Sequence, residues 1–292
     1  MVLESIVVPE SWEEHPRRML LIGFIYSTVG IFLGLWVFGK YASLSGIFLT
    51  TIPIVVVMYR AINGEEEKDM KICREYILMK EHMHILWFFL YLFIGMVMSY
   101  AFWFSFLPSD TITNIFSSQI DTIKSIGGSN AIGQALSPPA SDLAEAAQDR
   151  LRMIFMNNIR VWGFCILFSL IYGAGAVFIL VWNASVIGVA MGDVIRRGLV
   201  TLGQMENSNT LVNYFTVVPL SLAYLVHGIP EVASYFMGAL AGGIISVAVV
   251  CHHYRSKEFW HIITDSFDLA ILSLLTLFCA AFIEVYITPL LV

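Results

Sequence analysis

The sequence predicts an all-α protein that crosses a membrane several times, and its composition and the length of its apolar stretches both support this class. Hydrophobic residues make up 58% of the 292 residues and charged residues only 13%, whereas soluble domains average about 45–50% and about 25%. The mean hydropathy is +0.77. The apolar residues are grouped in stretches of about 20, the length that a helix needs to span a bilayer. We therefore expect a polytopic transmembrane helical bundle of about six spans, forming a single membrane domain over residues 1–292 in the cell membrane.

The N-terminal part, residues 1–107, should contain three spans. Met19–Phe38 and Ile85–Leu107 are long enough to cross the membrane as helices. Leu44–Tyr59 is shorter, and it qualifies if the helix tolerates Pro53 as a kink.

The segment 108–158 should contain two amphipathic helices on the outer side of the membrane. Apolar residues recur there at helical spacing in two groups, separated by a glycine pair and a proline pair. The first group is Ile112, Ile115, Phe116, Ile120 and Ile123, and the second is Leu143, Ala147, Leu151, Ile154 and Phe155. We expect these helices to lie on the membrane surface or to cap the bundle.

The C-terminal part, residues 159–292, should contain the remaining spans and one broken helix. Its apolar stretches are Val161–Trp182, Leu211–Val226, Val232–Cys251 and Leu269–Val292. The first of these continues to about Val194. Gly228 and Pro230 lie between the second and third stretches, where we expect them to break the helix.

The distribution of lysine and arginine predicts the orientation, because these residues are enriched in cytoplasmic loops. We expect the N-terminus in the cytoplasm and the segment 108–158 outside. The groups expected on the inner side are Arg17, Arg18, Arg196, Arg197, Arg255, Lys257 and the loop 60–84. With Arg196 and Arg255 on the same side, the segment 211–251 would form a re-entrant hairpin. Alternatively, both of its arms span the membrane and 184–200 is an additional span.

Polar residues inside these apolar stretches are the candidate functional groups, because ionisable side chains are costly at membrane depth. His227 and Glu231 are four residues apart, the helical spacing of paired metal ligands or of an acid–base couple. They could equally bond each other or cap backbone groups at the break. Glu284 lies within the last span and requires a partner, for which His227 or an asparagine amide would serve. The polar membrane centre that we predict comprises Asn157, Asn158, Arg160, Asn183, His227, Glu231 and Glu284.

Asn157, Asn158 and Arg160 precede the fourth apolar stretch, and Asn183 ends it. Asparagine at helix ends is usually a cap. Asn158 and Arg160 could also face an anionic head group or a partner.

Three Gly-xxx-Gly pairs lie within apolar stretches and predict close helix packing, because small residues allow two helix backbones to approach. The pairs are Gly30/Gly34, Gly188/Gly192 and Gly238/Gly242. They could pack helices within one chain or join two protomers of a dimer.

The sequence gives no reason to assign catalytic residues, a bound metal or a cofactor. It contains no phosphate-binding loop, dinucleotide fingerprint, nucleophile elbow or HExxH motif. Its four cysteines form no CxxC pair. A nucleic acid is not an expected partner, because a clustered basic face is missing.

Four segments, in the same order along the chain, give the sequence a resemblance to the stage II sporulation protein M-like family. The segments are Asn157-Asn158-Ile159-Arg160, Trp182-Asn183-Ala184 with Gly188, His227-Gly228-Ile229-Pro230-Glu231, and Ala281-Phe282-Ile283-Glu284-Val285 with Pro289. The resemblance is best from about residue 150 to the end and implies a multi-pass membrane protein. In spore formers the founding member is implicated in engulfment, where it anchors proteins that degrade peptidoglycan. The family has no established catalytic residues to carry over.

These observations favour a non-enzymatic membrane scaffold or anchor that recruits envelope proteins. We expect it to be a homo-oligomer, a dimer, in contact with membrane lipid. A transporter or channel for a small solute or ion, with a polar site around His227, Glu231 and Glu284, is the alternative. An intramembrane metalloenzyme that uses the same three residues as ligands is less favoured, because a catalytic zinc takes three protein ligands and a water, and no further ligand is evident.

Overall fold

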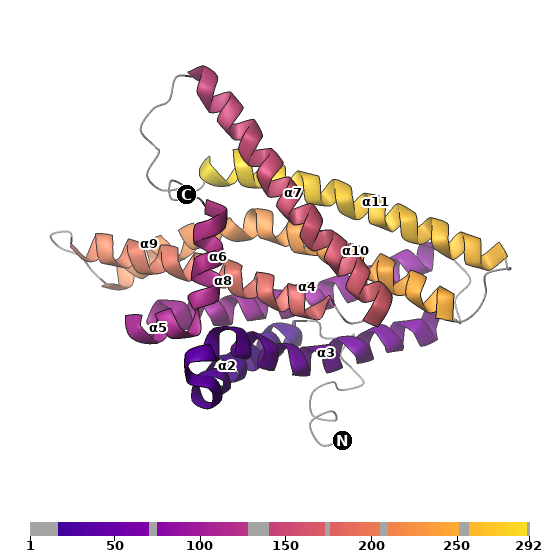
Figure 1. The fold of residues 1–292 in the computed structure, drawn as a ribbon, viewed down its shortest axis with the longest axis horizontal. Helices are drawn as coiled ribbons and strands as arrows, with labels where there is room; N and C mark the ends of the chain where they lie inside the picture. Colours follow the sequence, from indigo (N-terminus) through magenta and orange to yellow (C-terminus); the bar gives the residue numbers. More distant parts are fainter. Residues whose placement is uncertain are drawn as a thin grey trace.

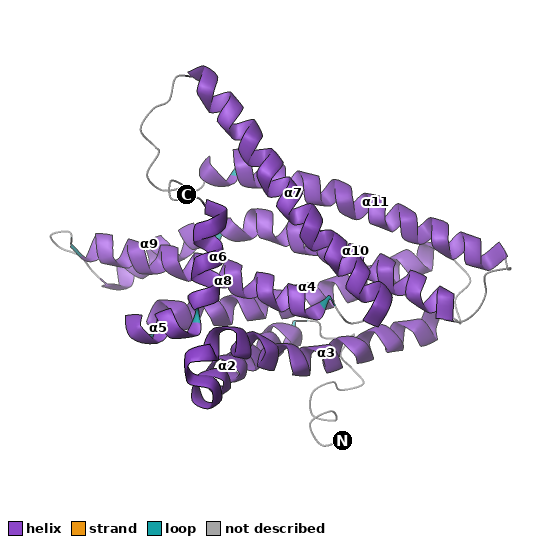
Figure 2. Cartoon of the chain, in the orientation of Figure 1, coloured by secondary structure: helices purple, strands orange, loops and turns teal. Residues whose placement is uncertain are grey.

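The computed structural model of the chain contains helices joined by short turns, and no strand, in the part that it describes, which is residues 17–69, 75–127, 140–172, 176–204, 210–250 and 257–290 (Figures 1 and 2). This confirms the predicted all-α class. The helices are α2 (Arg18–Phe38), the 3-10 helix η1 (Gly39–Tyr41), α3 (Ala42–Asp69), α4 (Glu75–Phe106), α5 (Ser109–Ile115), α6 (Ser117–Gly127), α7 (Ala140–Tyr172), α8 (Val177–Gly203), α9 (Thr210–Ser221), α10 (Ala223–Val250), α11 (Lys257–Tyr286) and the 3-10 helix η3 (Thr288–Leu290).

Six helical stretches of the described residues are long and apolar enough to cross a membrane, as predicted. The first of them, Arg18–Met58, contains two helices, because the chain reverses at Gly39. Gly39 has a φ of 49°, in the left-handed region that favours glycine. After this turn α3 runs back along α2, and Pro53 is accommodated inside α3. The first stretch therefore supplies an antiparallel helix pair.

The helices α3 and α4 extend beyond their predicted spans. The sequence predicted a loop over 60–84, but α3 continues to Asp69 and α4 begins at Glu75. The side chains of residues 59–85 lie outside the described part, as does Arg255. Further along, α4 contributes to the core, where Phe88, Phe93 and Tyr100 are fully buried.

The short helices α5 and α6 form part of the bundle. Ile112, Ile115 and Phe116 are buried, and the rings of Phe116 and Tyr100 lie 6.4 Å apart. Of the two predicted arrangements for this amphipathic segment, packing against the bundle is the observed one.

The second predicted amphipathic helix is not a separate element. It is the first half of α7, which runs without a break from Ala140 to Tyr172 and therefore also contains much of the predicted fourth span. Figure 1 shows α7 crossing the other helices diagonally, with its N-terminal half projecting beyond them. The fourth span does not end at Trp182, because a new helix, α8, begins at Val177. The alternative in which 184–200 is an additional span is confirmed in that respect, because α8 contains these residues and is a separate apolar stretch. The position of the boundary was missed because the sequence on both sides of it is apolar.

This boundary changes the predicted position of Arg196. Its guanidinium donates hydrogen bonds to the Leu107 carbonyl (2.7 Å) and to Ser109 Oγ (2.8 Å). Arg196, and Arg197 beside it, therefore lie at the same end of the bundle as the segment 108–158, and not at the opposite end as predicted. The prediction treated 161–194 as one span, whereas these residues belong to two helices, α7 and α8. Every later segment was therefore assigned to the wrong side of the membrane relative to the segment 108–158. The cytoplasmic position of the N-terminus remains a prediction.

The helices α9 and α10 follow one another along a single apolar stretch, Val212–Ser246, which is neither a re-entrant hairpin nor two spans. The predicted break at Gly228 and Pro230 is wrong, because α10 continues through both residues. The chain instead bends at Leu222, three residues after Pro219. A proline is tolerated inside a membrane helix when neighbouring helices hold its two halves in place, and α10 packs against both α7 and α11.

Candidate functional site

Three of the predicted polar residues meet along the interface between α10 and α11. His227 Nδ1 lies 3.0 Å from Thr288 Oγ1, and the imidazole is only 7% exposed. This bond joins the first turns of α10 to the 3-10 helix at the end of the chain. Tyr224, one turn before His227, packs its ring against the imidazole at 6.0 Å. His227 is therefore buried where the start of α10 meets η3.

His227 and Glu231 do not bond each other. The Tyr235 hydroxyl donates a hydrogen bond of 2.8 Å to Glu231 Oε1, one turn further along α10. Tyr235 is fully buried. The two members of the predicted i, i+4 pair thus have different partners: His227 contacts Thr288, and Glu231 accepts a hydrogen bond from Tyr235.

Glu231 and Glu284 face each other across the same interface. The two helices run antiparallel, so the His227–Thr288 contact places Glu231, four residues later, opposite Glu284, four residues earlier. The two carboxylates are close enough for their charges to interact. Like charges in an apolar interior repel one another, and the pair is stabilised when a proton or a cation accompanies it.

The helices α7 and α10 each add a buried polar group beside this pair. Trp162 of α7 donates a hydrogen bond to Ser273 of α11 and lies against Gly238 of α10. One turn before these contacts, Asn158 and Ser234 lie at the same height on α7 and α10. Both are buried, and Asn158 Nδ2 and Ser234 Oγ have no hydrogen-bond partner among the described residues.

The remaining predicted polar residues lie elsewhere. Asn183 is inside α8, where its amide donates to the Ile179 carbonyl at 3.0 Å. It is not a cap at a span end. Asn157 and Arg160 lie within α7 on its exposed side. The structure therefore brings together His227, Glu231 and Glu284, with Asn158 nearby.

The Gly-xxx-Gly pairs lie against neighbouring helices of the same chain. Gly30 and Gly34 face α3, Gly188 and Gly192 face α4, and Gly238 and Gly242 face α7. At every one of these positions an added Cβ would come within 3.0 Å of another atom. Each pair thus fixes the distance between two helices of one chain.

Sequence reasoning missed a buried network that ties α6 to α3 and α8. Ser43 donates to Gln119 Oε1 at 2.9 Å, and Gln119 Nε2 donates to Ser185 at 3.2 Å. Gln119 is buried, although it belongs to a short helix between spans. Gln119 lies four residues before Ile123, which packs against the core, and this spacing places it on the apolar face of α6. The sequence therefore contained a signal for its burial.

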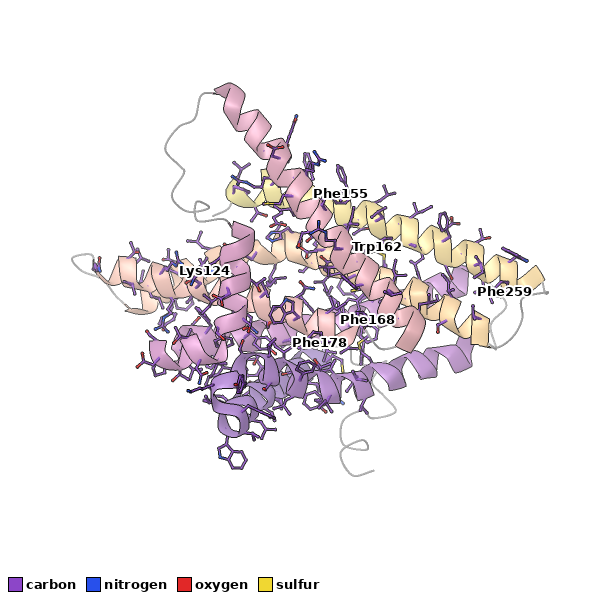
Figure 3. All side chains as sticks on the ribbon, in the orientation of Figure 1. Lys124, Phe155, Trp162, Phe168, Phe178 and Phe259 are labelled. Atoms are coloured by element: carbon purple, nitrogen blue, oxygen red, sulfur yellow. The ribbon has the colours of Figure 1, made fainter. Side chains whose placement is uncertain are left out.

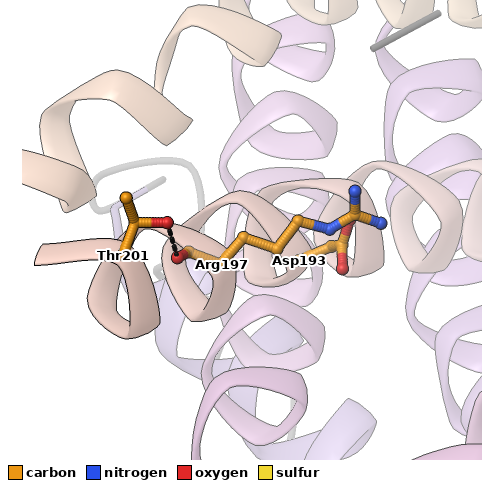
Figure 4. A network of polar contacts seen from close by, with 3 residues as sticks. All are labelled: Asp193, Arg197 and Thr201. Atoms are coloured by element: carbon orange, nitrogen blue, oxygen red, sulfur yellow. Dashed lines mark hydrogen bonds and ion pairs between the residues drawn. The ribbon is translucent and has the colours of Figure 1, made fainter. Parts of the chain in front are cut away.

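The sequence also did not reveal how α8 is held at its C-terminal end. Arg196 binds the end of α4, as described above, where free backbone carbonyls accept hydrogen bonds. The next residue, Arg197, forms an ion pair of 2.8 Å with Asp193 (Figure 4). The Thr201 hydroxyl donates a hydrogen bond to the Arg197 carbonyl. Within the described ranges, no group of three His, Cys, Asp or Glu side chains is placed to hold a metal ion.

Comparisons with known proteins agree with the resemblance noted from the sequence. The family model described as "Stage II sporulation protein M" matches residues 84–289. An uncharacterized protein of Methanocaldococcus jannaschii is 28% identical over 139 residues, which are 47% of this chain and 69% of that protein. No solved structure matches the chain. The family match includes α7, α10 and α11 and covers more than half of the chain, which therefore belongs to the stage II sporulation protein M family.

Proposed function

We propose that the protein is a non-enzymatic membrane anchor that recruits another membrane or envelope protein. The observation that carries this proposal is the exposed side of α7. Asn157 and Arg160 lie there within the apolar stretch Ala147–Leu170, surrounded by exposed apolar side chains. A charged group in such a position is stabilised when a group outside the chain pairs with it.

The rest of the bundle supports an anchoring role, because it is built to hold its shape. Close glycine contacts fix α2 against α3, α4 against α8, and α7 against α10. The Gln119 network secures α6 to the same bundle. A rigid bundle with one unpartnered polar face suits the presentation of a fixed surface to a partner.

Native mass spectrometry of the full chain, purified gently from its own membranes, tests this proposal. The expected result is a complex with another protein in fixed stoichiometry. A chain that carries only lipid, in every mild detergent in which it remains folded, would contradict the anchoring role.

A second candidate function, ion transport or conduction, is favoured by the Glu231–Glu284 pair. Two facing carboxylates between membrane helices can exchange a proton or bind a monovalent cation. In vesicles that contain the purified chain, this reading expects a flux of H⁺, Na⁺ or K⁺ that is lost in both Glu231→Gln and Glu284→Gln. The neighbouring substitution Gly243→Ala, in open space on α10, should leave the flux intact. The lack of flux for all three ions in the unmodified protein would reject this function.

A further inference from the structure

The outward face of α7 includes the exposed residues Met153, Met156, Asn157, Arg160, Phe164 and Phe168. These residues are three, four or seven apart and therefore lie on one side of the helix. The labelled side chains Phe155, Trp162 and Phe168 mark the course of α7 across the bundle (Figure 3). Within the stretch Ala147–Leu170 only 22% of an 18-residue apolar window is buried, the smallest share among the six apolar stretches of the described residues.

Arg160 is the costly member of this face. It lies eight residues, about 12 Å, after the charged Arg152 and twelve residues, about 18 Å, before the end of α7 at Tyr172, at 1.5 Å per residue. No described residue forms a hydrogen bond or ion pair with it. Arginines in membrane spans almost always face the bundle interior or a cavity and are paired, whereas this one points outward.

The charge of Arg160 decides between the molecules that could cover this face. In a two-fold dimer built through α7, the face would meet its own copy and bring Arg160 against Arg160. Like charges at that depth are unfavourable. An apolar helix would bury the guanidinium without a partner. A helix that carries a carboxylate satisfies both the apolar side chains and the charge.

Resting on the proposed anchoring function, we infer that the outward face of α7 binds a transmembrane helix of another protein that carries an aspartate or glutamate. The planar guanidinium of Arg160 can hold a carboxylate with two parallel hydrogen bonds. Asn157, one turn away on the same face, supplies an amide donor and acceptor. The methionine side chains adapt to an irregular helix surface, and Phe164 and Phe168 supply apolar area.

The test measures binding of two synthetic leucine-rich helices to the full chain in phosphatidylcholine vesicles by energy transfer from a label on the chain. The helices are of about 20 residues and differ only in a central glutamate or glutamine. Polar contacts between membrane helices strengthen their association by a modest amount. The glutamate helix should therefore bind about tenfold more tightly than the glutamine helix, where tenfold is about 1.4 kcal/mol.

Two substitutions assign this preference to one residue. Arg160→Gln should bind both helices equally, whereas Arg197→Gln, at an exposed arginine of α8, should retain the preference. Equal binding of the two helices by the unmodified chain would overturn the inference. A chain that instead pairs with its own copy, or that gains affinity only with anionic lipid, would assign the face to a second protomer or to lipid head groups and would overturn it as well.

The two proposals can fail separately. The chain could prefer the glutamate helix through Arg160 and yet carry no protein partner in its own membranes. This result would support carboxylate binding by α7 and reject the anchoring function. A stoichiometric native partner, combined with no preference between the two helices, would retain the function and reject this surface.

Discussion

Two adjacent glycines on α10 give a sharp test of how closely α7 and α10 pack. A Cβ added at Gly242 would lie 2.6 Å from the Ile166 carbonyl oxygen, whereas one added at Gly243 would meet no atom within 4 Å. The two residues are in the same helix, and the same methyl group is added to each. Only the neighbour across the interface differs.

The expected free energies follow from two opposing effects. Alanine is favoured over glycine in a helix interior by about 0.8–1 kcal/mol, and this is the whole effect expected for Gly243→Ala. At Gly242 the new methyl group meets backbone, which cannot move away by changing a rotamer. Overpacking of this kind costs about 1–3 kcal/mol. The free energy of unfolding of Gly242→Ala should therefore be about 1–3 kcal/mol lower than that of Gly243→Ala.

Thermal unfolding in detergent, followed by intrinsic tryptophan fluorescence, measures this difference. One kcal/mol corresponds to about 2–4 °C for a domain of about 150–250 residues. Gly243→Ala should melt at or slightly above the unmodified protein, and Gly242→Ala several degrees below Gly243→Ala. Equal melting temperatures, or the reverse order, would refute the packing of α7 on α10 that positions the polar interface.

Two further substitutions test contacts that the sequence did not reveal. Arg196→Gln removes the charged donor from the Leu107 carbonyl and should destabilise the protein by about 1–3 kcal/mol in the same melting assay, whereas Arg197→Gln, which breaks only a surface ion pair, should cost less than about 1 kcal/mol. If the two arginine variants melt alike, Arg196 does not secure the end of α4. Tyr235→Phe leaves Glu231 without its hydrogen bond and should cost about 1–3 kcal/mol; an unchanged melting temperature would show that this bond is not formed.

The fold class and most spans could be predicted because apolar length is a direct requirement of the bilayer. Met19–Phe38 and Ile85–Leu107 coincide closely with α2 and the latter part of α4. The glycine pairs could also be recognised, because a missing side chain leaves a local mark in the sequence. Which helix each pair contacts could not be read from the sequence, since that depends on the arrangement of the whole bundle.

Helix boundaries inside apolar sequence could not be predicted. Hydropathy is uniform across the boundary between α7 and α8, so the error there propagated to the side on which Arg196 lies. Pro230 was expected to break its helix, yet packing by α7 and α11 holds α10 continuous, and the bend follows Pro219 instead. Tertiary contacts thus overrode the local tendency of proline to break a helix.

The candidate site was predictable in its members but not in its pairings. His227, Glu231 and Glu284 were recognisable because ionisable groups are rare in apolar spans. Their partners Thr288 and Tyr235 are common residues in membrane helices, and nothing in their sequence context marks them. The outward position of Arg160 was likewise hidden, because a helix face becomes exposed only when its neighbours are placed.

The central claim is that the outward face of α7 contacts another protein, and site-specific photocrosslinking in the native membrane tests it most directly. A photoreactive phenylalanine analogue replaces Phe164 on that face or, as a control, Phe267, which is 63% exposed on α11. From position 164 the account predicts a cross-link to a transmembrane segment of a different protein that contains aspartate or glutamate, with none from position 267. Cross-links from position 164 only to lipid, or only to a second copy of this chain, would contradict it.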